Sequence, residues 1–569
     1  MTFTRRSHAC LTHTLACPPR RAYPQGVFDG EFVNEEGEKR FKLDFIVGEK
    51  DGLGVENLRG SGMIAGETSA AYEETFTLSY VTGRSVGIGA YINRLAQRVI
   101  QMQNGPMILT GFSALNKLLG KEVYVSQDQL GGPQIMLPNG VAHQLASDDQ
   151  DGVEKILRWL SYVPRVASEQ VAIAACVDPV SRDIVYTPPN TPYDPRHMLA
   201  GTTSADGTFE PGFFDAGSFT EYLAEWGKSV VVGRARLGGI PMGVIAVETR
   251  LVEQIVPADP ANPLSRQATL AQAGQVWYPD SAFKTAQALS DFNAAENLPT
   301  MIFANWRGFS GGTRDMFSEV LKFGAQIVDN LRTYKHPVFV YIPPNGELRG
   351  GAWVVVDPTI NEEMMEMYVD NNARGGILEP PGICDVKFRK PDLIKTMHRL
   401  DSTILQLDAE LAAAEEAMVD DVSSLKKAIV ARETQLMPLY VQISHEFADL
   451  HDRPGRMKAK GVIRDIVPWA KAREYFYWRV RRRLMQDALV SELKDADSNL
   501  AHADCLRMIA SWTDASWEDD QAVLAFFESQ GAVIDEKLGA VRTDSVKATV
   551  SALLDSLTPE AKAALLKTL

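Results

Sequence analysis

Three glycine-rich turns, each holding an arginine, are the residues of this chain best suited to chemistry. They are Thr82-Gly83-Arg84-Ser85-Val86-Gly87-Ile88-Gly89, Asn305-Trp306-Arg307-Gly308-Phe309-Ser310-Gly311-Gly312 and Glu347-Leu348-Arg349-Gly350-Gly351-Ala352-Trp353. Glycine lets the main chain approach a ligand closely and leaves backbone N–H groups free to point at it. Such donors suit the stabilisation of an oxyanion better than the supply of a nucleophile. The turns therefore predict a site whose chemistry depends on backbone amides.

The strands and helices that would position these turns alternate along the chain. A strand at Thr75–Val81 precedes the first turn, and a helix from about Ala90 follows it. Two apolar runs flank Gly238-Gly239 and predict a β-hairpin. Helices then alternate with strands, which predicts crossover units in an α/β fold, and such folds bind ligands at strand ends. The expected elements are a helix at Ser281–Asn293, a strand at Thr300–Ala304, a helix at Arg314–Leu331, and strands at Val338–Ile342 and Trp353–Val356.

Length and composition limit the class of protein. With 569 residues and 45% hydrophobic content, the chain is long enough for at least two globular domains. The net charge of -15 argues against general nucleic-acid binding, although a local basic patch still suits a phosphate-bearing ligand. Five cysteines without close metal-like spacing indicate a reducing compartment, with neither structural zinc nor disulfides. The sequence has no run of about eighteen apolar residues, so a membrane span is not supported.

Changes in texture along the chain predict its domain organisation. The proline-rich stretch Tyr186–Pro195 breaks both periodicities and predicts a linker. From Leu393 to Leu450 the pattern becomes helical, with leucines on one face and charges on the other. We therefore expect one domain at 25–185, a second at 186–500 that includes a helical insertion at 393–450, and a helical extension at 501–569.

Two further segments have unusual composition. Residues 1–24 hold four arginines and no acidic residue, as an organelle transit peptide does. A spurious or unstructured start explains them as well, so the segment stays unassigned. Arg473–Leu484 places aromatic residues beside arginines, which predicts an interface helix with ion pairs rather than a nucleic-acid site. Near the end we expect small helices, the last of them opened by Thr558-Pro559-Glu560 as a cap followed by a first-turn proline.

In their order, these segments resemble the carboxyltransferase domain of eukaryotic, multidomain acetyl-CoA carboxylase. The resemblance runs from about Glu49 to the end of the chain, through Gly52–Leu58, Gly87–Tyr91, Val231–Pro241, the Asn305 and Glu347 turns and Leu378-Glu379-Pro380. It implies an α/β fold of two crotonase-like (ClpP/crotonase) β-β-α superhelix subdomains, the first N-terminally truncated. It also implies a head-to-tail homodimer, with the active site between the N-terminal subdomain of one chain and the C-terminal subdomain of the other.

The activity implied by the resemblance is the movement of CO2 from carboxybiotin, held on a separate carrier segment, to acetyl-CoA. The product is malonyl-CoA, and the reaction is the first committed step of fatty acid synthesis. ATP would be used only at a biotin carboxylase domain, which this chain does not contain. The family therefore implies biotin carboxylase and biotin carrier segments as partners, and a cytoplasmic location with the plastid as the alternative. No side-chain base is obligatory in this chemistry, so the lack of a Ser/His/Asp signature is expected.

The resemblance also assigns roles to glycines. Gly350 and Gly351 match residues that present backbone amides to biotin, and the turn at Gly87-Ile88 matches one that presents amides to the reacting end of the other substrate. Each such donor lowers the barrier by roughly 3 kcal/mol, judging by the removal of comparable donors. The alternative is that these glycines serve turn conformation alone.

The remaining site residues are charged. Arg307 matches an arginine near the carboxylate being transferred, where a bidentate fork suits a planar anion, and its alternative is a structural ion pair. Glu379 matches a glutamate near the active site, which either takes part or holds an arginine in place. Arg84, Lys387 and Arg389 match positions that contact CoA, although solvated surface charge is the default for such residues. Lys387 and Arg389 alternate, so a strand would send both from one face.

Some features depart from the family and leave other functions open. The family has a Gly-Ala-Arg turn upstream of the matched region that contributes to the thioester oxyanion hole, and this turn is not in the sequence. We therefore expect a C-terminal piece of a longer polypeptide, or a truncated gene model, with doubtful activity on its own. The alternative function is a non-catalytic module for CoA binding and dimerisation. A propionyl- or methylcrotonyl-CoA carboxyltransferase fits less well, because the helical insertion and C-terminal extension resemble the acetyl-CoA type. His143 and His445 are expected to be structural.

Overall fold

The computed structural model describes residues 28–35, 37–46, 54–166, 169–559 and 561–562. The chain divides into two compact units, 1–70 and 71–569. In the first unit, β1 (Phe28–Glu35) and β2 (Glu38–Ile46) form an antiparallel hairpin. A 3-10 helix, η2 (Val55–Leu58), and the start of α2 (Ser61–Glu74) follow. The segment 1–24 lies outside the described residues.

A seven-stranded sheet holds the core of the second unit. Its first three strands are antiparallel and the others run parallel. Every residue of β12 is buried, as expected for a strand covered on both faces. The hairpin predicted around Gly238-Gly239 is confirmed, and both glycines have positive φ. In spatial order the strands are β10 (Thr220–Tyr222), β11 (Val230–Leu237), β12 (Ile240–Val247), β16 (Thr300–Phe303), β18 (Val338–Ile342), β20 (Met365–Val369) and β22 (Asp465–Ile466).

The parallel part of the sheet is built from a repeated unit of a long strand, a short strand and a helix. The short strands leave the sheet at the carboxyl end of each long strand and pair among themselves, β15 with β17 and β19 with β21. The predicted turns at the strand ends therefore lie together at one edge. The repeated elements are β15 (Val276–Trp277), α9 (Pro279–Asn293), β17 (Gly308–Phe309), α10 (Thr313–Phe317), α11 (Val320–Arg332), β19 (Glu347–Arg349), α12 (Gly350–Val355), β21 (Arg374–Gly376) and α13 (Pro380–Lys387).

The same arrangement occurs in smaller form before residue 165. Strands β3, β5 and β7 make a parallel sheet, and the short strands β4 and β6 pair beside it. Helix α3 follows the first short strand, as predicted for the Gly87 turn. The elements are β3 (Ser79–Val81), β4 (Ser85–Val86), α3 (Ile88–Leu95), β5 (Val99–Met102), β6 (Met107–Ile108), α4 (Phe112–Leu119), α5 (Asp128–Gly131), α6 (Pro133–Met136), β7 (Gln144–Ala146) and α7 (Asp149–Leu160).

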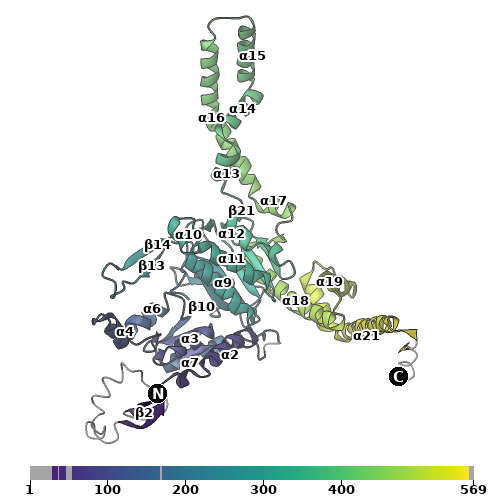
Figure 1. The fold of residues 1–569 in the computed structure, drawn as a ribbon. Coiled ribbons are helices and arrows are strands. Elements are labelled where there is room, and N and C mark those ends of the chain that lie inside the picture. Colours follow the sequence, from purple (N-terminus) through teal and green to yellow (C-terminus); the bar gives the residue numbers. More distant parts are fainter. Residues whose placement is uncertain (1–27, 36, 47–53, 167–168, 560, 563–569) are drawn as a thin grey trace. The chain divides into compact units, whose positions relative to one another are not determined.

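Helices α9 and α11 lie against the sheet, whereas α14, α15 and α16 extend away from it (Figure 1). The insertion predicted at Leu393–Leu450 is helical as expected, and its two long helices, α15 and α16, pack against each other. Described helices here and at the C-terminal end are α14 (Lys390–Leu400), α15 (Ser402–Glu416), α16 (Ser423–His451), α17 (Pro454–Ala459), α18 (Trp469–Ala496), α19 (His502–Ser511), α20 (Asp520–Ser529) and α21 (Gly531–Ser556). The remaining elements are α8 (Pro195–Ala200), η3 (Pro358–Ile360) and two small strand pairs. One pair is β8 (Thr202–Thr203) with β9 (Phe209–Glu210), and the other is β13 (Val252–Val256) with β14 (Ala268–Gln272).

Three local predictions differ from the structure. The segment Trp353–Val356 was expected as a strand but forms the end of α12 and its C-cap. The apolar run follows Gly350, and the helix starts at that glycine. Lys387 ends α13 and Arg389 caps α14, so the strand expected there is wrong. The helix expected over Arg314–Leu331 is broken between α10 and α11, where Glu319 has a φ of 70°.

The C-terminal predictions are partly confirmed. Helix α21 is longer than the small helices that we expected. The cap at Thr558 is present, because its hydroxyl accepts a hydrogen bond from the N–H of Ala561 at 3.3 Å. Glu560 lies outside the described residues. Within the described residues, no helix is both long and apolar enough to cross a membrane.

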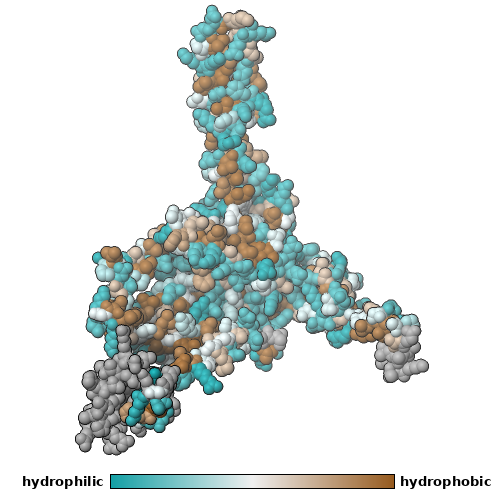
Figure 2. Space-filling model, in the orientation of Figure 1, coloured by the Kyte–Doolittle hydropathy of each residue, from teal (hydrophilic) through white to brown (hydrophobic). Residues whose placement is uncertain are grey.

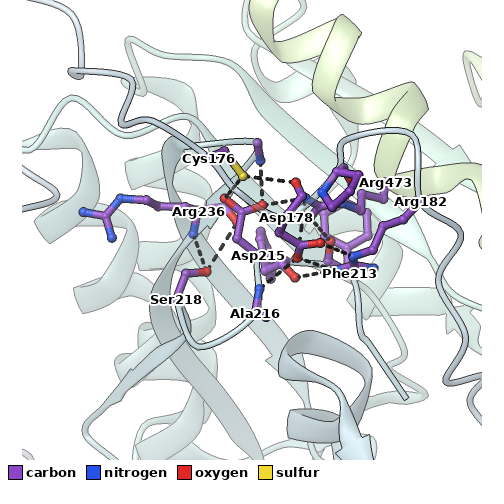
Figure 3. A network of polar contacts seen from close by, with 12 residues as sticks. Cys176, Asp178, Arg182, Phe213, Asp215, Ala216, Ser218, Arg236 and Arg473 are labelled. Carbon is purple, nitrogen blue, oxygen red and sulfur yellow. Dashed lines mark hydrogen bonds and ion pairs between the residues drawn. The ribbon is translucent and has the colours of Figure 1, made fainter. Parts of the chain in front are cut away.

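Arginines of α18 connect this helix to the core. Figure 3 shows one such network, in which Asp215 accepts hydrogen bonds from the backbone of Gly238 and Gly239 at 2.8 Å each and from Arg473 at 2.7 Å. The Cys176 thiol lies 3.3 Å from the same carboxylate. The ion pairs predicted for this helix are therefore confirmed. Their partners lie in this chain, so these arginines are buried inside the fold and do not form the surface that we expected.

A second buried network joins the smaller sheet to the seven-stranded one. Glu296 accepts hydrogen bonds from Arg98, the residue just before β5, and from Arg234 of β11, at 2.5 to 2.6 Å, and all three side chains are buried. His143, also buried, lies 3.2 Å from Asp291, and burial lowers the pKa of its imidazole. The structural role expected for His143 agrees with this position.

The predicted linker is held in place by hydrogen bonds. The carbonyl of Tyr186 accepts from the Trp469 indole at 2.8 Å, and that of Pro188 accepts from Asn345 at 3.0 Å. The two compact units of the chain divide near residue 70. The domain boundaries at 185 and 500 stay predictions.

Candidate active site

Arg307 lies where the chain leaves β16 and enters β17. Its backbone N–H donates to the carbonyl of Gln275 at 2.8 Å, which fixes the main chain. Its Nε donates to Oε1 of Glu347 at 2.6 Å, yet 55% of the side chain remains exposed. Within the described residues, no protein group accepts a hydrogen bond from its two terminal nitrogens. The outer edge of the guanidinium is therefore available to a planar anion.

Glu347 begins a run of alternating charges. Its Oε2 accepts from Nε of Arg349 at 2.9 Å, and Arg349 in turn donates to Oδ2 of Asp452 at 2.5 Å. Burial opposes the charge of Arg349, but its hydrogen bonds to Asp452 and Glu347 outweigh burial and raise the pKa of the guanidinium. We call these four residues, Arg307, Glu347, Arg349 and Asp452, the charge chain.

The glycine turn follows the charge chain directly. Gly350 has a φ of 40° and opens α12, and a Cβ placed on it would lie 3.0 Å from the carbonyl of Ile377. The backbone N–H groups of Gly350 and Gly351 are in the first turn of this helix, where no intrahelical acceptor exists. A pocket of about 350 Å³ opens beside Gly350, with Ile377 and Lys460 in its wall. The structure thus brings the two predicted glycines and Arg307 to one edge of the sheet.

Glu379 joins the same group through the backbone. Arg349 donates to the carbonyl of Leu378 at 3.2 Å, next to Glu379 in the chain. Glu379 is the N-terminal cap residue of α13, but its side chain makes no capping hydrogen bond. The residue is partly buried, and within the described residues its carboxylate makes no hydrogen bond or ion pair.

The Gly87 turn belongs to the smaller sheet. Gly87 has a φ of 58°, which favours glycine, and its N–H donates to the carbonyl of Ile108 at 2.9 Å. This amide is already used in the fold. The next two amides, of Ile88 and Gly89, are in the first turn of α3 and have no intrahelical acceptor. The turn therefore offers Ile88 and Gly89 as donors, and Gly87 serves its conformation.

The three expected CoA-contacting cations are exposed. Arg84 lies in the turn between β3 and β4. Lys387 ends α13, and Arg389 makes one long contact of 3.4 Å to Asp392. Both cations are therefore presented by the junction of two helices instead of one strand face.

The residues fall into two groups. Arg84, Gly87 and Ile88 belong to the smaller sheet, whereas Arg307, Gly350, Gly351, Glu379, Lys387 and Arg389 belong to the larger one. Within the described part of the chain, no hydrogen bond or ion pair joins the first group to the second. Nor do the described residues contain a group of three or more His, Cys, Asp or Glu side chains that could hold a metal ion.

Sequence reasoning gave no role to three members of the charge chain, Glu347, Arg349 and Asp452. Glu347 was part of a recognised motif without a role of its own, although its spacing of two from Arg349 on a strand puts both side chains on one face. Asp452 had no sequence signal, because it lies 103 residues beyond Arg349.

Comparison with known proteins identifies the family. The carboxyl transferase domain family matches residues 27–484, and the chain belongs to that family. Among similar proteins are the acetyl-CoA carboxylases of Saccharomyces cerevisiae (strain ATCC 204508 / S288c), 53% identical over 513 residues, and Dictyostelium discoideum, 52% identical over 509 residues. A protein of S. cerevisiae (strain RM11-1a) named as a mitochondrial acetyl-CoA carboxylase is 51% identical over 508 residues.

These relatives are much longer than the chain. The alignments cover 90%, 87% and 88% of this chain but only 23%, 22% and 22% of the relatives. The chain therefore spans less than a quarter of the curated relatives that it matches. The resemblance expected from the sequence, to the carboxyltransferase part of a multidomain acetyl-CoA carboxylase, is confirmed.

A solved structure supports the fold. A crystal structure of transcarboxylase 12S with hydrolysed methylmalonyl-coenzyme A bound has a TM-score of 0.55 and 16% identity, covering 76% of this chain and 69% of that one. At this identity the likeness concerns the fold alone. It confirms the crotonase-like α/β architecture, in agreement with the repeated strand, strand and helix units.

Proposed function

We propose that this chain moves CO2 from carboxybiotin, presented on a carrier segment, to acetyl-CoA and so forms malonyl-CoA. One observation carries the proposal. The terminal nitrogens of Arg307, unpaired among the described residues, and the backbone amides of Gly350 and Gly351 lie at the same end of the sheet. A cation for a carboxylate and two donors for an oxyanion are what this transfer needs from a protein. The family and the acetyl-CoA carboxylase relatives support the choice of reaction.

The residues fit the two substrates. The bare amides of Gly350 and Gly351, beside a pocket of about 350 Å³, suit the ureido carbonyl of biotin. Biotin supplies the activated CO2 and, once free of it, the nitrogen that accepts the methyl proton. The amides of Ile88 and Gly89 suit the thioester oxygen. Arg307 orients the carboxylate, and ATP has no role at these residues.

The phosphates of CoA are assigned to Arg84, Lys387 and Arg389. All three are exposed, and this protein is otherwise strongly acidic, so they are local cations in a negative background. Glu379 stays a lesser candidate near the reacting groups, because its carboxylate has no role in helix capping.

A head-to-tail homodimer is part of the proposal, because the two groups of site residues share no hydrogen bond within the chain. Both groups also carry exposed apolar side chains, among them Ile88 and Tyr91 near the first, and Val354 and Ile377 near the second. Figure 2 shows hydrophobic surface along the helical segment that carries α13 and α16. Exposed apolar surface of this kind is typical of interaction sites. Biotin carboxylase and carrier segments are the other partners that we propose, in a cytoplasmic location or, alternatively, in the plastid.

The test is carboxyl transfer in the reverse direction. The full-length protein that carries this chain is given malonyl-CoA and free biotin, and acetyl-CoA is measured, with methylmalonyl-CoA as a parallel substrate. We expect turnover of malonyl-CoA well above that of methylmalonyl-CoA. Binding of CoA by calorimetry without turnover would instead favour the non-catalytic module. A preference for methylmalonyl-CoA would favour the propionyl-CoA type.

A further inference from the structure

The charge chain has a geometry that a simple surface ion pair lacks. Each oxygen of Glu347 accepts from a different arginine, Oε1 from Arg307 at 2.6 Å and Oε2 from Arg349 at 2.9 Å. The two arginines differ in their surroundings, because 55% of the Arg307 side chain is exposed but only 4% of the Arg349 side chain is. A buried arginine therefore holds one end of the carboxylate, and the carboxylate holds an exposed arginine.

The way in which Glu347 contacts Arg307 leaves the functional edge free. The contact uses Nε alone, so Glu347 engages neither terminal nitrogen, and the fork that these two nitrogens make for a carboxylate stays open. A bidentate contact through these nitrogens would block the fork. An exposed arginine with no partner would sample many rotamers, and ordering it on substrate binding would cost side-chain entropy.

Three hydrogen bonds fix the buried end of the charge chain. The backbone N–H of Glu347 donates to Oδ1 of Asn305 at 3.0 Å, two residues before Arg307. Asp452, the C-cap residue of α16, accepts from Arg349 at 2.5 Å, and its carbonyl accepts from the N–H of Gly375 at 3.1 Å.

Close packing at Gly376 shows that this end leaves little room. A Cβ on Gly376 would lie 2.6 Å from Oδ1 of Asp452 and 3.2 Å from a terminal nitrogen of Arg349. Asp452 also has little solvent contact. The position of Arg349 is thus set by the base of the helical insertion, 103 residues away in sequence.

We propose that Glu347, Arg349 and Asp452 are positioning residues, which hold Arg307 with its terminal nitrogens facing the carboxylate that is transferred. The inference rests on the proposed function for the role of Arg307 itself. Arg349 also holds the Leu378 carbonyl, so the same residues place the segment leading to Glu379. The base of the helical insertion is thereby part of the site's architecture, although it supplies no group to the substrates.

The test is a double-mutant cycle in the full-length protein, with malonyl-CoA and free biotin as substrates. Glu347→Gln keeps the size of the side chain but loses the charge shared by the two arginines. We expect kcat to fall between about ten- and a hundredfold, as for a displacement of about 1 Å, while the KM for malonyl-CoA stays unchanged. In an Arg307→Ala background, the same substitution should cause no further loss, because Glu347 acts through Arg307.

A matched control and a second variant complete the design. Glu518→Gln removes an exposed carboxylate that contacts an arginine at 3.3 Å far along the chain, and it should leave kcat unchanged. Asp452→Asn changes the other end of the charge chain and leaves Glu347 intact. We expect a smaller fall in kcat, and no further fall when the substitution is made in the Arg307→Ala background. This variant tests the inference even where Glu347→Gln folds poorly.

The outcomes separate this inference from the proposed function. Two results would overturn the positioning role alone. One is that the losses in kcat are additive in the double variants. The other is full kcat in Glu347→Gln together with a large loss of kcat in Arg307→Ala. Full kcat in Arg307→Ala would overturn the role proposed for Arg307, and the inference with it.

Discussion

Replacement of Arg307 by alanine should separate turnover from folding and from CoA binding. The side chain is 55% exposed, and among the described residues its polar partner is Glu347. Exposed ion pairs contribute about 0 to 1 kcal/mol, so the free energy of unfolding should change by no more than about 1 kcal/mol. Binding of CoA should stay within a few-fold, because we assign its phosphates to Lys387 and Arg389.

The expected loss lies in kcat. Arg307 supplies charge-assisted donors to a group on which charge is moved, and loss of one preorganised donor of this kind costs roughly a hundred- to a thousandfold in rate. Such a loss equals about 3 to 4 kcal/mol of activation free energy, several times the expected change in stability. The two quantities therefore differ enough to be separated by experiment.

The assay is steady-state transfer from malonyl-CoA to free biotin, with CoA binding followed by calorimetry and unfolding by urea. Arg507→Ala is the matched control, because Arg507 is also an exposed arginine with a single carboxylate partner. Equal losses in turnover and in CoA binding would refute the reasoning, since Arg307 would then act on the phosphates. A large loss of stability would refute it as well, because Arg307 would then be a structural residue.

Three further predictions concern the cations and the buried charges. Lys387→Ala with Arg389→Ala should raise the KM for malonyl-CoA and make it less dependent on salt, with kcat nearly unchanged; an unchanged KM would remove both residues from the CoA site. Glu296→Gln, which strands two buried arginines, should cost about 3 to 5 kcal/mol of unfolding free energy in urea, and a loss under about 1 kcal/mol would contradict this. Burial lowers the pKa of Lys284 to about 7 in the folded chain. Because the unfolded chain then binds more protons between about pH 7 and 10, the free energy of unfolding should rise by roughly 1 kcal/mol per pH unit there, and Lys284→Met should remove this rise; an equal slope in both proteins would disprove it.

The sequence alone was enough to predict the elements whose cause is local. The β11–β12 hairpin follows from two apolar runs around Gly238-Gly239, and both glycines indeed take the positive φ that their turn needs. The helical insertion likewise follows from apolar spacing on one face. The strand predicted at Trp353–Val356 was wrong, because a short apolar run fits a buried strand and a buried helix equally well, and only the turn before it decides between them.

The site divides in the same way. Residue types and motif order predicted the glycine turns, Arg307 and the family, because backbone donors beside an arginine have a recognisable local pattern. The partner of Arg349 could not be predicted, since Asp452 reaches it only when the end of α16 packs against β21. The hydrogen bond of the Gly87 amide could not be predicted either, because its acceptor, the carbonyl of Ile108, belongs to β6. Sequence by itself determined which groups are present; the tertiary structure decided which of them are free and how they are aimed, because hydrogen bonds between distant segments depend on packing that no local pattern contains.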